Sequence, residues 1–300
     1  FVIIYNKLKQ RYIEFSKHPL VENPVYAIAR YLIVNVLFIF QVFNLKVKWV
    51  NNLKYYLSNE DSSMKENYYC HIGNFDDSLF ILNYINPDET FVDVGANVGH
   101  FTLLTNGLIG AKTISIEPVK KTFARLVANI NLNKLSNVIA HNIAISSSNE
   151  YLKIINHRGE LNKVSCENEK KYEIVRALTL DQLLMKEDNV SLVKIDVEGY
   201  EKYILKGAKK TLSNKNLNII IIELNGLNNY YKYNELDVIN ILIENNFRPF
   251  RFIPNEKKLY PLSNKNSLAH NTLFIRNINL AKERLSKRII SINKSNIYIS

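Results

Sequence analysis

The pattern of hydrophobic and polar residues changes near residue 90. From there on, short apolar runs alternate with amphipathic stretches of helical spacing. This pattern predicts strands at 90–94, 112–116, 138–142, 191–195, 217–224 and 272–276, and helices at 120–135, 201–212 and 236–246. Such alternation is typical of an α/β fold with a doubly wound, mainly parallel sheet of the Rossmann-like kind, covered by helices on both faces.

The N-terminal part of the chain follows a different pattern. It predicts a helix at 24–41 and then a hairpin in which 46–50 pairs with 53–57 across a turn at 51–52. A further helix is predicted at 76–85, before a proline that cannot continue it. This part therefore has a helical and hairpin structure of its own.

Residues 149–176 interrupt the alternation with a short strand at 151–155 and a polar loop. We interpret them as an insertion over the edge of the sheet. The predicted organisation is an N-terminal extension at 1–85, an α/β domain at 86–280 and a basic tail at 281–300.

The stretch 31–43 is almost entirely apolar and is followed by Lys46 and Lys48. It is shorter than the roughly 20 apolar residues that a spanning helix needs. The favoured interpretation is a helix that packs on the protein, and a helix lying on a membrane surface is the alternative. With no signal-peptide pattern in view, we expect a cytoplasmic protein with the option of peripheral membrane contact through 31–43.

The composition is that of a globular protein, with 47% hydrophobic and 22% charged residues among 300. Long disordered, collagen-like and coiled-coil chains are excluded. The net charge of +11 suits phosphate-bearing or anionic partners. No module of stacked aromatic and basic residues is visible, so we expect no specific nucleic acid partner. Cys70 and Cys166 are too few and too far apart for a disulfide framework or a transition-metal site.

The strongest motif is F-V-D-V-G-A-N-V-G-H-F-T at 91–102, where a strand leads through a glycine turn into a helix. Gly95 and Gly99 permit the turn and the close packing of the helix. Asp93 stands where the dinucleotide fingerprint has its first glycine. An acid at this place opposes a pyrophosphate and favours a cationic amino group, such as that of S-adenosylmethionine. The spacing D-x-G-x-x-x-G is that of class I methyltransferases.

Two further residues end the next two strands. Glu117 lies about 20 residues after the glycine turn, the spacing at which an acid accepts hydrogen bonds from ribose hydroxyls. Asn142 could contact the edge of the adenine, and a simple role in a turn is an equal alternative. Both therefore belong to the predicted cofactor site.

The third motif is L-V-K-I-D-V-E-G-Y-E at 192–201. Lys194 and Asp196 point to the same side of their strand because side chains alternate, and a lysine in a covered strand needs a charged partner. Asp196 and Glu198 end this strand, and Glu223 ends the following one, all at the edge where parallel sheets bind ligands. Capping of the following helix is the structural alternative. We predict no resident metal, because Asp196 and Glu198 have no third ligand in view and no His or Cys pattern accompanies them.

These segments together resemble a known family. FVDVGANVGHFT, SIEP, HNIAI, LTLDQLL, KIDVEGYE, KGA and IIELN, in this order, are similar to the FkbM-family methyltransferases over about residues 70–275. The resemblance implies a class I fold, dependence on S-adenosylmethionine, and O-methylation, often of glycans or secondary metabolites. A weaker resemblance, at 22–31, is to a subgroup found with polysaccharide genes.

The family motifs map onto this sequence residue by residue. The resemblance assigns Asp93, Gly95, Asn97 and Gly99 to the cofactor loop, Glu117 to the ribose, and Asp196 and Glu198 to the acidic motif after the strand. His100 departs from the family pattern and receives no role.

We therefore predict an S-adenosylmethionine-dependent O-methyltransferase that acts on a hydroxyl of a sugar or glycan. The general base is sought among Asp196, Glu198, Glu223 and Lys194, which the sequence does not rank. His71 and His141 are weaker candidates. The acceptor pocket is expected to lie under the extension up to residue 77 and the loop at 156–172.

Two alternatives remain open at this stage. The acceptor could be a small secondary metabolite or a lipid in place of a glycan. The chain could also be a non-catalytic glycan-binding or scaffold protein on a degenerate methyltransferase fold, although its intact glycines and acids argue against this.

Overall fold

The computed structural model describes residues 2–40, 45–155, 162–165, 171–288 and 292. The chain forms two compact units, one of residues 1–75 with 291–300 and one of residues 76–290. Each unit is described by itself.

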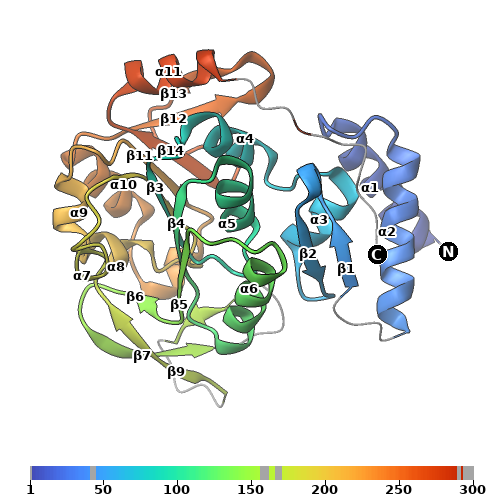
Figure 1. Ribbon diagram of the computed structural model, residues 1–300, viewed down its shortest axis with the longest axis horizontal. Helices are drawn as coiled ribbons and strands as arrows, with labels where there is room; N and C mark the ends of the chain where they lie inside the picture. Colours follow the sequence, from blue (N-terminus) through green and yellow to red (C-terminus); the bar gives the residue numbers. More distant parts are fainter. Residues whose placement is uncertain (1, 41–44, 156–161, 166–170, 289–291, 293–300) are drawn as a thin grey trace. The chain divides into compact units, whose positions relative to one another are not determined.

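The second unit is built on a sheet with the strand order β13-β12-β14-β11-β10-β3-β4-β5 (Figure 1). The strands are β3 (Thr90–Val94), β4 (Lys112–Ile116), β5 (Val138–His141), β10 (Val190–Ile195), β11 (Ile219–Glu223), β12 (Arg248–Ile253), β13 (Lys258–Pro261) and β14 (Asn271–Ile275). The five strands from β11 to β5 are parallel, and β14, β12 and β13 extend the sheet in antiparallel fashion. This confirms the predicted fold class.

Helices cover both faces of this sheet because its central strands are apolar on both sides. They are α4 (Phe75–Tyr84), α5 (His100–Leu104), α6 (Lys120–Leu132), α7 (Leu180–Leu183), α8 (Glu201–Lys206), α9 (Lys209–Ser213), α10 (Glu235–Glu244) and α11 (Ile278–Lys287), with short helical turns η2 (Thr105–Ile109), η3 (Leu227–Tyr231) and η4 (Pro254–Glu256). One core cluster joins α8, α9 and α10 to the sheet, and a second joins α4, α5 and α11 to it. All residues of β3 and β10 are buried.

The strand order reverses between β3 and β10. The chain proceeds outward from β3 through β4 to β5, and from β10 to β11 in the opposite direction. At such a switch point the loops after neighbouring strands diverge, which leaves a place for a ligand at the carboxyl ends of the strands. The motifs after β3 and β10 both begin there.

Two parts of this unit differ from the sequence prediction. The region 149–176 contributes to a second sheet of order β6-β9-β7-β8, with β6 (Ala144–Ile145), β7 (Glu150–Ile155), β8 (Lys163–Val164) and β9 (Glu173–Leu178), so it has more strand than the predicted polar loop. The helix predicted at 201–212 is two helices, α8 and α9. A Cβ atom at Gly207 would lie 2.2 Å from the carbonyl oxygen of Ser146, so the chain breaks at a glycine that packs on the small sheet. Parts of the loop at 156–172 lie outside the described residues.

The first unit contains α1 (Val2–Lys17), α2 (Pro24–Ile39), the hairpin of β1 (Leu45–Lys48) and β2 (Lys54–Leu57) around η1 (Val50–Asn52), and α3 (Ser62–Cys70). The helix at α2 and the antiparallel hairpin are as predicted. Asn51 and Asn52 have φ angles of 49° and 68°, which asparagine tolerates better than most residues. Trp49 and Tyr55 from the two sides of this turn are fully buried.

The unit boundaries differ from the predicted domain limits. Helix α4 belongs to the second unit, because Phe80, Ile81 and Tyr84 pack in the core of the sheet. The predicted tail begins inside α11, whose residues Ala281 and Leu285 are buried in the same core. Among the described helices, none combines the length and apolar character needed to cross a membrane.

Candidate active site

The turn after β3 packs against the end of β10 so closely that it requires glycine. Gly95 has a φ of +84°, and a Cβ atom there would lie 1.9 Å from the carbonyl oxygen of Asp196. Gly99 has a φ of +100°, and its Cβ atom would lie 2.7 Å from Cδ1 of Leu126 in α6. The glycines predicted from the motif are therefore needed to join the loop, β10 and α6.

Asp93 is buried at the carboxyl end of β3, and only one of its two carboxylate oxygens has a hydrogen-bond partner. Thr102 donates a hydrogen bond of 3.0 Å from Oγ1 to Oδ2 of Asp93. The other oxygen, Oδ1, is buried without a hydrogen-bond partner. Burial raises the pKa of Asp93 to about 6, although the nearby Lys194 opposes this shift. A cationic group placed at Oδ1 would satisfy the oxygen and favour its ionised form.

Glu117 ends β4 and holds the glycine loop by its carboxylate. Oε2 accepts a hydrogen bond from the backbone N–H of Asn97 at 3.1 Å, and Oε1 accepts one from that of Val119 at 2.9 Å. Burial raises the pKa of Glu117 to about 7, against the effect of these two N–H groups. Each oxygen keeps a second lone pair, so the carboxylate could also accept bonds from a diol.

Asn142 supports the backbone around Glu117. Its Nδ2 atom donates to the carbonyl oxygens of Glu117, at 3.0 Å, and Pro118, at 2.9 Å. These contacts fit the role in a turn that the sequence left open. Contact with an adenine through Oδ1 stays a prediction.

Lys194 and Asp196 form an ion pair on β10. Nζ of Lys194 lies 2.7 Å from Oδ2 of Asp196 and 4.8 Å from the centre of the Phe101 ring. Burial alone would lower the pKa of Lys194, but the carboxylates of Asp196, Asp93 and Asp77 together raise it. Burial opposes ionisation of Asp196 too, yet Lys194 and a hydrogen bond with Glu223 hold its pKa below the ordinary value. The pair is therefore ionised, as the sequence predicted for a lysine in this strand.

Glu223 lies beside this pair at the end of β11. Burial, the charge of Asp196 and a hydrogen bond to it raise the pKa of Glu223 to about 9. At neutral pH this shift favours the protonated form of Glu223, which can donate to Asp196. Two carboxyl groups this close oppose the ionisation of both at once, an arrangement that is common in active sites.

Asp77 and Asn271 lie near Lys194 and Asp196 although both are outside the predicted motifs. Nδ2 of Asn271 donates to Oδ2 of Asp77 at 2.6 Å, and burial raises the pKa of Asp77 to about 6. Asn271 is paired with Glu223 in the register of the sheet. Since β14 is antiparallel to β11, its first residue lies at the edge where β11 ends. Asn271 could have been assigned to this edge from the sequence only if the order of the strands had been known.

A second buried acid fixes the loop after β10. The backbone N–H of Gly199 donates to Oε1 of Glu201 at 3.0 Å, and Tyr233 Oη donates to Gly199 O at 2.8 Å and lies 3.2 Å from Oε2 of Glu201. A Cβ atom at Gly199 would lie 2.6 Å from the carbonyl carbon of Leu227. These contacts hold Glu198 in its left-handed conformation, with a φ of 56°. The sequence did not single out Glu201 or Tyr233.

One family model matches the part of the chain that contains the glycine loop, Glu117 and the acidic motif after β10. A model described as the methyltransferase FkbM domain matches residues 93–249, from the acid of the glycine loop to the start of β12. The chain belongs to the FkbM methyltransferase family. This confirms the predicted family and, with it, an S-adenosylmethionine-dependent methyltransferase.

The FkbM methyltransferase was also compared with solved structures and curated proteins. PH0793 of Pyrococcus horikoshii, described as a transferase, has 16% identity and a TM-score of 0.44, with 82% of each chain covered. M. jannaschii TYW2 in complex with AdoMet has 17% identity and a TM-score of 0.39, with 75% of this chain and 84% of that one covered. The methyltransferase SMU.1697c of Streptococcus mutans, in complex with SAH, has 12% identity and a TM-score of 0.41, with 67% and 95% covered. No curated protein matched.

The histidines of this FkbM methyltransferase have structural contacts. Nε2 of His100 lies 2.9 Å from Oγ of Ser78, which ties α5 to α4. His71 belongs to the first unit, where its carbonyl oxygen accepts a bond from Nε1 of Trp49 at 2.5 Å. His141 ends β5, and burial lowers its pKa. None of these contacts involves the acidic cluster of Asp196, Glu198 and Glu223. His270 does act on this cluster, because its charge lowers the pKa of Asp196.

Asp196, Glu198 and Glu223 are also close enough to share a cation. One carboxylate oxygen of each lies within 4.8 Å of the others, and oxygen ligands suit Mg²⁺ or Ca²⁺. In the absence of a cation, Lys194 pairs with Asp196, and burial and the closeness of Asp196 raise the pKa of Glu223. That no metal resides here stays a prediction.

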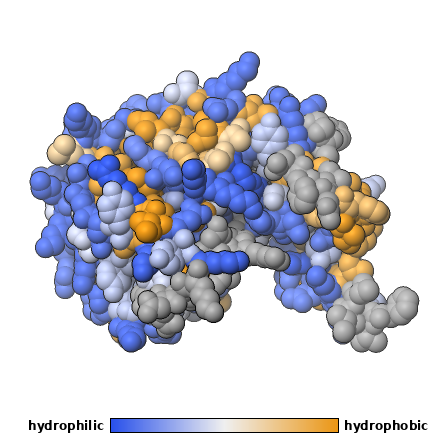
Figure 2. All heavy atoms as spheres, turned by 90° about the horizontal axis from the view of Figure 1, so that it is seen from below, coloured by the Kyte–Doolittle hydropathy of each residue, from blue (hydrophilic) through white to orange (hydrophobic). Residues whose placement is uncertain are grey.

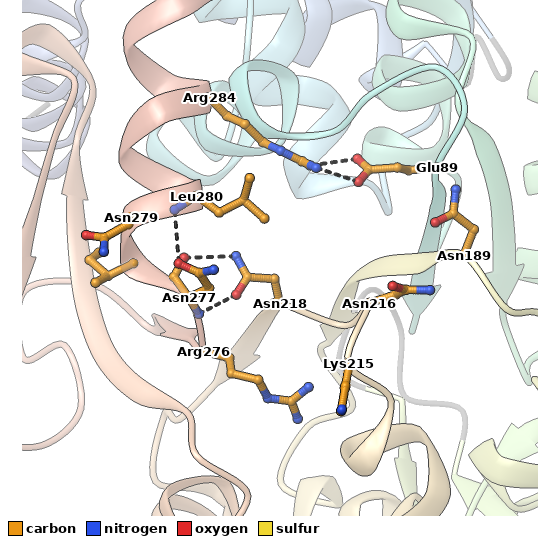
Figure 3. A pocket seen from close by; sticks show the side chains of 11 residues that line it. Glu89, Asn189, Lys215, Asn216, Asn218, Arg276, Asn277, Asn279, Leu280 and Arg284 are labelled. Carbon is orange, nitrogen blue, oxygen red and sulfur yellow. Dashed lines mark hydrogen bonds and ion pairs between the residues drawn. The ribbon is translucent and has the colours of Figure 1, made fainter.

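A cavity of about 600 Å³ lies elsewhere in the unit (Figure 3). Glu89 and Asn189 come before β3 and β10, and Asn218 before β11, so the cavity is at the amino ends of the strands. Figure 3 shows Arg284 donating two hydrogen bonds to Glu89, at 2.8 Å each. No predicted catalytic or cofactor residue lines this cavity, so it is not the candidate active site.

Proposed function

We propose that this FkbM methyltransferase transfers the methyl group of S-adenosylmethionine to a hydroxyl oxygen of a sugar or glycan. The observation that carries the proposal is the carboxylate of Asp196, 2.7 Å from the buried Nζ of Lys194, at the carboxyl edge where the glycine loop meets β10. A general base must be ionised before it can accept the proton of an alcohol, and Asp196 meets this condition.

The residues around the loop suit the cofactor. The unpartnered Oδ1 of Asp93 would pair with the amino group of the methionine part, and the free lone pairs of Glu117 with the two ribose hydroxyls. Bound S-adenosylmethionine supplies a methyl carbon already activated by its sulfonium.

The chain then has three tasks. The glycine loop and Glu117 orient the cofactor so that the acceptor oxygen approaches the methyl carbon in line. Asp196 accepts a hydrogen bond from the acceptor hydroxyl and takes its proton as the new C–O bond forms and the C–S bond breaks. Lys194 keeps Asp196 ionised, and Glu223 orients it through a hydrogen bond.

A sugar is the acceptor class that these groups suit best. A cluster of carboxylates can accept hydrogen bonds from several neighbouring hydroxyls, which sugars offer. The resemblance of residues 22–31 to enzymes found with polysaccharide genes points the same way. A small secondary metabolite or a lipid with a hydroxyl group is the alternative, and mass spectrometry of each acceptor class after incubation with the enzyme separates them.

Calorimetry tests the cofactor assignment. The protein should bind S-adenosylmethionine and its demethylated product but not NAD, because Asp93 opposes a pyrophosphate. Glu117→Ala should weaken this binding by about 1–3 kcal/mol, the scale of a lost charged hydrogen bond.

The matched control is Glu150→Ala, which also removes a carboxylate that accepts two hydrogen bonds, from Ser146 and Ser148 in the turn between β6 and β7. It should leave cofactor binding unchanged. Equal affinities for the parent and Glu117→Ala would remove Glu117 from the site, and binding of NAD alone would overturn the proposal.

A further inference from the structure

The most exposed side chains of helix α2 in the first unit are all aliphatic or aromatic. Its exposed residues are Val25, Tyr26, Ala29, Leu32, Ile33, Val36 and Ile39, and Phe40 follows directly. Tyr26, Ile39 and Phe40 are each at least 70% exposed. Figure 2 shows apolar side chains gathered on the surface of this unit. We call these eight residues the α2 stripe.

The stripe is continuous along the helix. Its members recur at intervals of three, four and seven residues, which places them on one side of an α-helix over an arc of roughly 140°. On the opposite side Ala27, Val34 and Phe38 are buried in the unit. A helix that is apolar all round is usually covered all round, so the stripe is a surface that a partner would cover.

The charges of this unit identify the kind of partner. Helix α2 contains no acidic residue, and basic residues outnumber acidic ones along residues 2–75. Lys7 and Lys9 on α1 and Lys48 on β1 are exposed. An apolar helix face accompanied by exposed cations is the combination that binds membranes with anionic headgroups.

We propose that the α2 stripe is a docking surface for an anionic lipid bilayer. The helix lies in the plane of the interface, with the aliphatic residues and Phe40 at the level of the acyl chains and Tyr26 at that of the headgroups. This inference does not depend on the acceptor of the methyl group.

A second copy of this chain suits the stripe less well. Helix pairs associate through a narrow seam of two positions in seven, whereas this stripe is about twice as broad as such a seam needs. Two copies would also bring like-charged units together.

Co-sedimentation with vesicles tests the proposal. The protein should bind vesicles of phosphatidylcholine and phosphatidylglycerol, and bind less at high salt and to phosphatidylcholine alone. Ile33→Glu with Val36→Glu should reduce the partition coefficient by at least roughly tenfold, because both side chains would leave the interface. The matched control is Leu268→Glu, at a residue of the second unit that is 76% exposed and lies outside the stripe.

Circular dichroism and cofactor binding show whether the variants are folded, and exposed positions should tolerate the change. Equal binding of parent and double variant, or no vesicle binding by the folded parent, overturns the proposal. A parent that dimerises in analytical ultracentrifugation, with the dimer and not vesicle binding lost in the double variant, overturns it in favour of a second copy.

Discussion

Nζ of Lys194 lies 2.7 Å from Oδ2 of Asp196, the residue two positions further along the same strand. The lysine side chain is only 2% exposed, whereas that of the aspartate is 33% exposed. The cation is therefore buried inside the sheet, and its partner faces the edge where the motifs meet. This arrangement keeps a carboxylate ionised at a place where burial would otherwise neutralise it.

Removal of the cation should destabilise the protein. Lys194→Met leaves Asp196 without its partner, and we expect a loss of about 3 kcal/mol in the free energy of unfolding, measured by denaturant. The double variant with Asp196→Asn should recover part of this loss, because it removes the uncompensated charge. If the two single losses simply add, the residues do not act as a pair.

The protonated state of Glu223 should appear in the pH dependence of stability. With a pKa of about 9, folded Glu223 keeps its proton while the unfolded chain releases it above its ordinary pKa of 4.5. The folded state then binds more protons, so the parent loses stability as pH rises through this window. Glu223→Gln lacks the titrating group, and its stability relative to the parent should rise by up to about 1.4 kcal/mol per pH unit.

Denaturant unfolding between about pH 5 and pH 8 measures this difference. The control is Glu187→Gln, at an acid paired with Lys112 outside the site. A constant difference between Glu223→Gln and the parent over this range would mean that Glu223 ionises normally.

The close approach of the glycine loop to β10 gives a prediction with an internal control. Gly95→Ala adds a Cβ atom 1.9 Å from the backbone of Asp196, whereas Gly110, with a φ of +78°, has open space around its Cβ position. Gly110→Ala should cost only the strain of the left-handed conformation, about 1 kcal/mol. Gly95→Ala should cost more stability and abolish cofactor binding. Equal effects of the two substitutions would contradict the required close approach.

Much of the fold follows from local pattern. Strands β3 and β4 begin and end where the apolar runs predict, since burial on both faces leaves a continuous hydrophobic signal. The sequence pattern did not predict the break of the helix at Gly207 or most of the small sheet. Both depend on contacts between residues that are far apart in the sequence. Gly207 packs on the backbone of Ser146, which is distant in sequence.

The site was predictable to the extent that it lies within motifs. Lys194 and Asp196 are two residues apart, so strand geometry alone brings them to one side. Asp77 and Asn271 join the cluster only because α4 and an antiparallel strand reach the same edge, which no local pattern reveals. The ranking of Asp196 above Glu223 as the base likewise required the pKa difference that their proximity creates.

The assignment of Asp196 as the general base is tested most directly by Asp196→Asn, with cofactor affinity and the methyl transfer rate measured on the same preparation. We predict calorimetric affinity for S-adenosylmethionine within a few-fold of the parent, and turnover lower by about 10²–10⁴-fold, the usual effect of removing a general base. Glu198→Gln, at the other acid of the same motif, is the comparison and should lose less. Full turnover by Asp196→Asn, or loss of cofactor binding by a folded variant, would contradict the account.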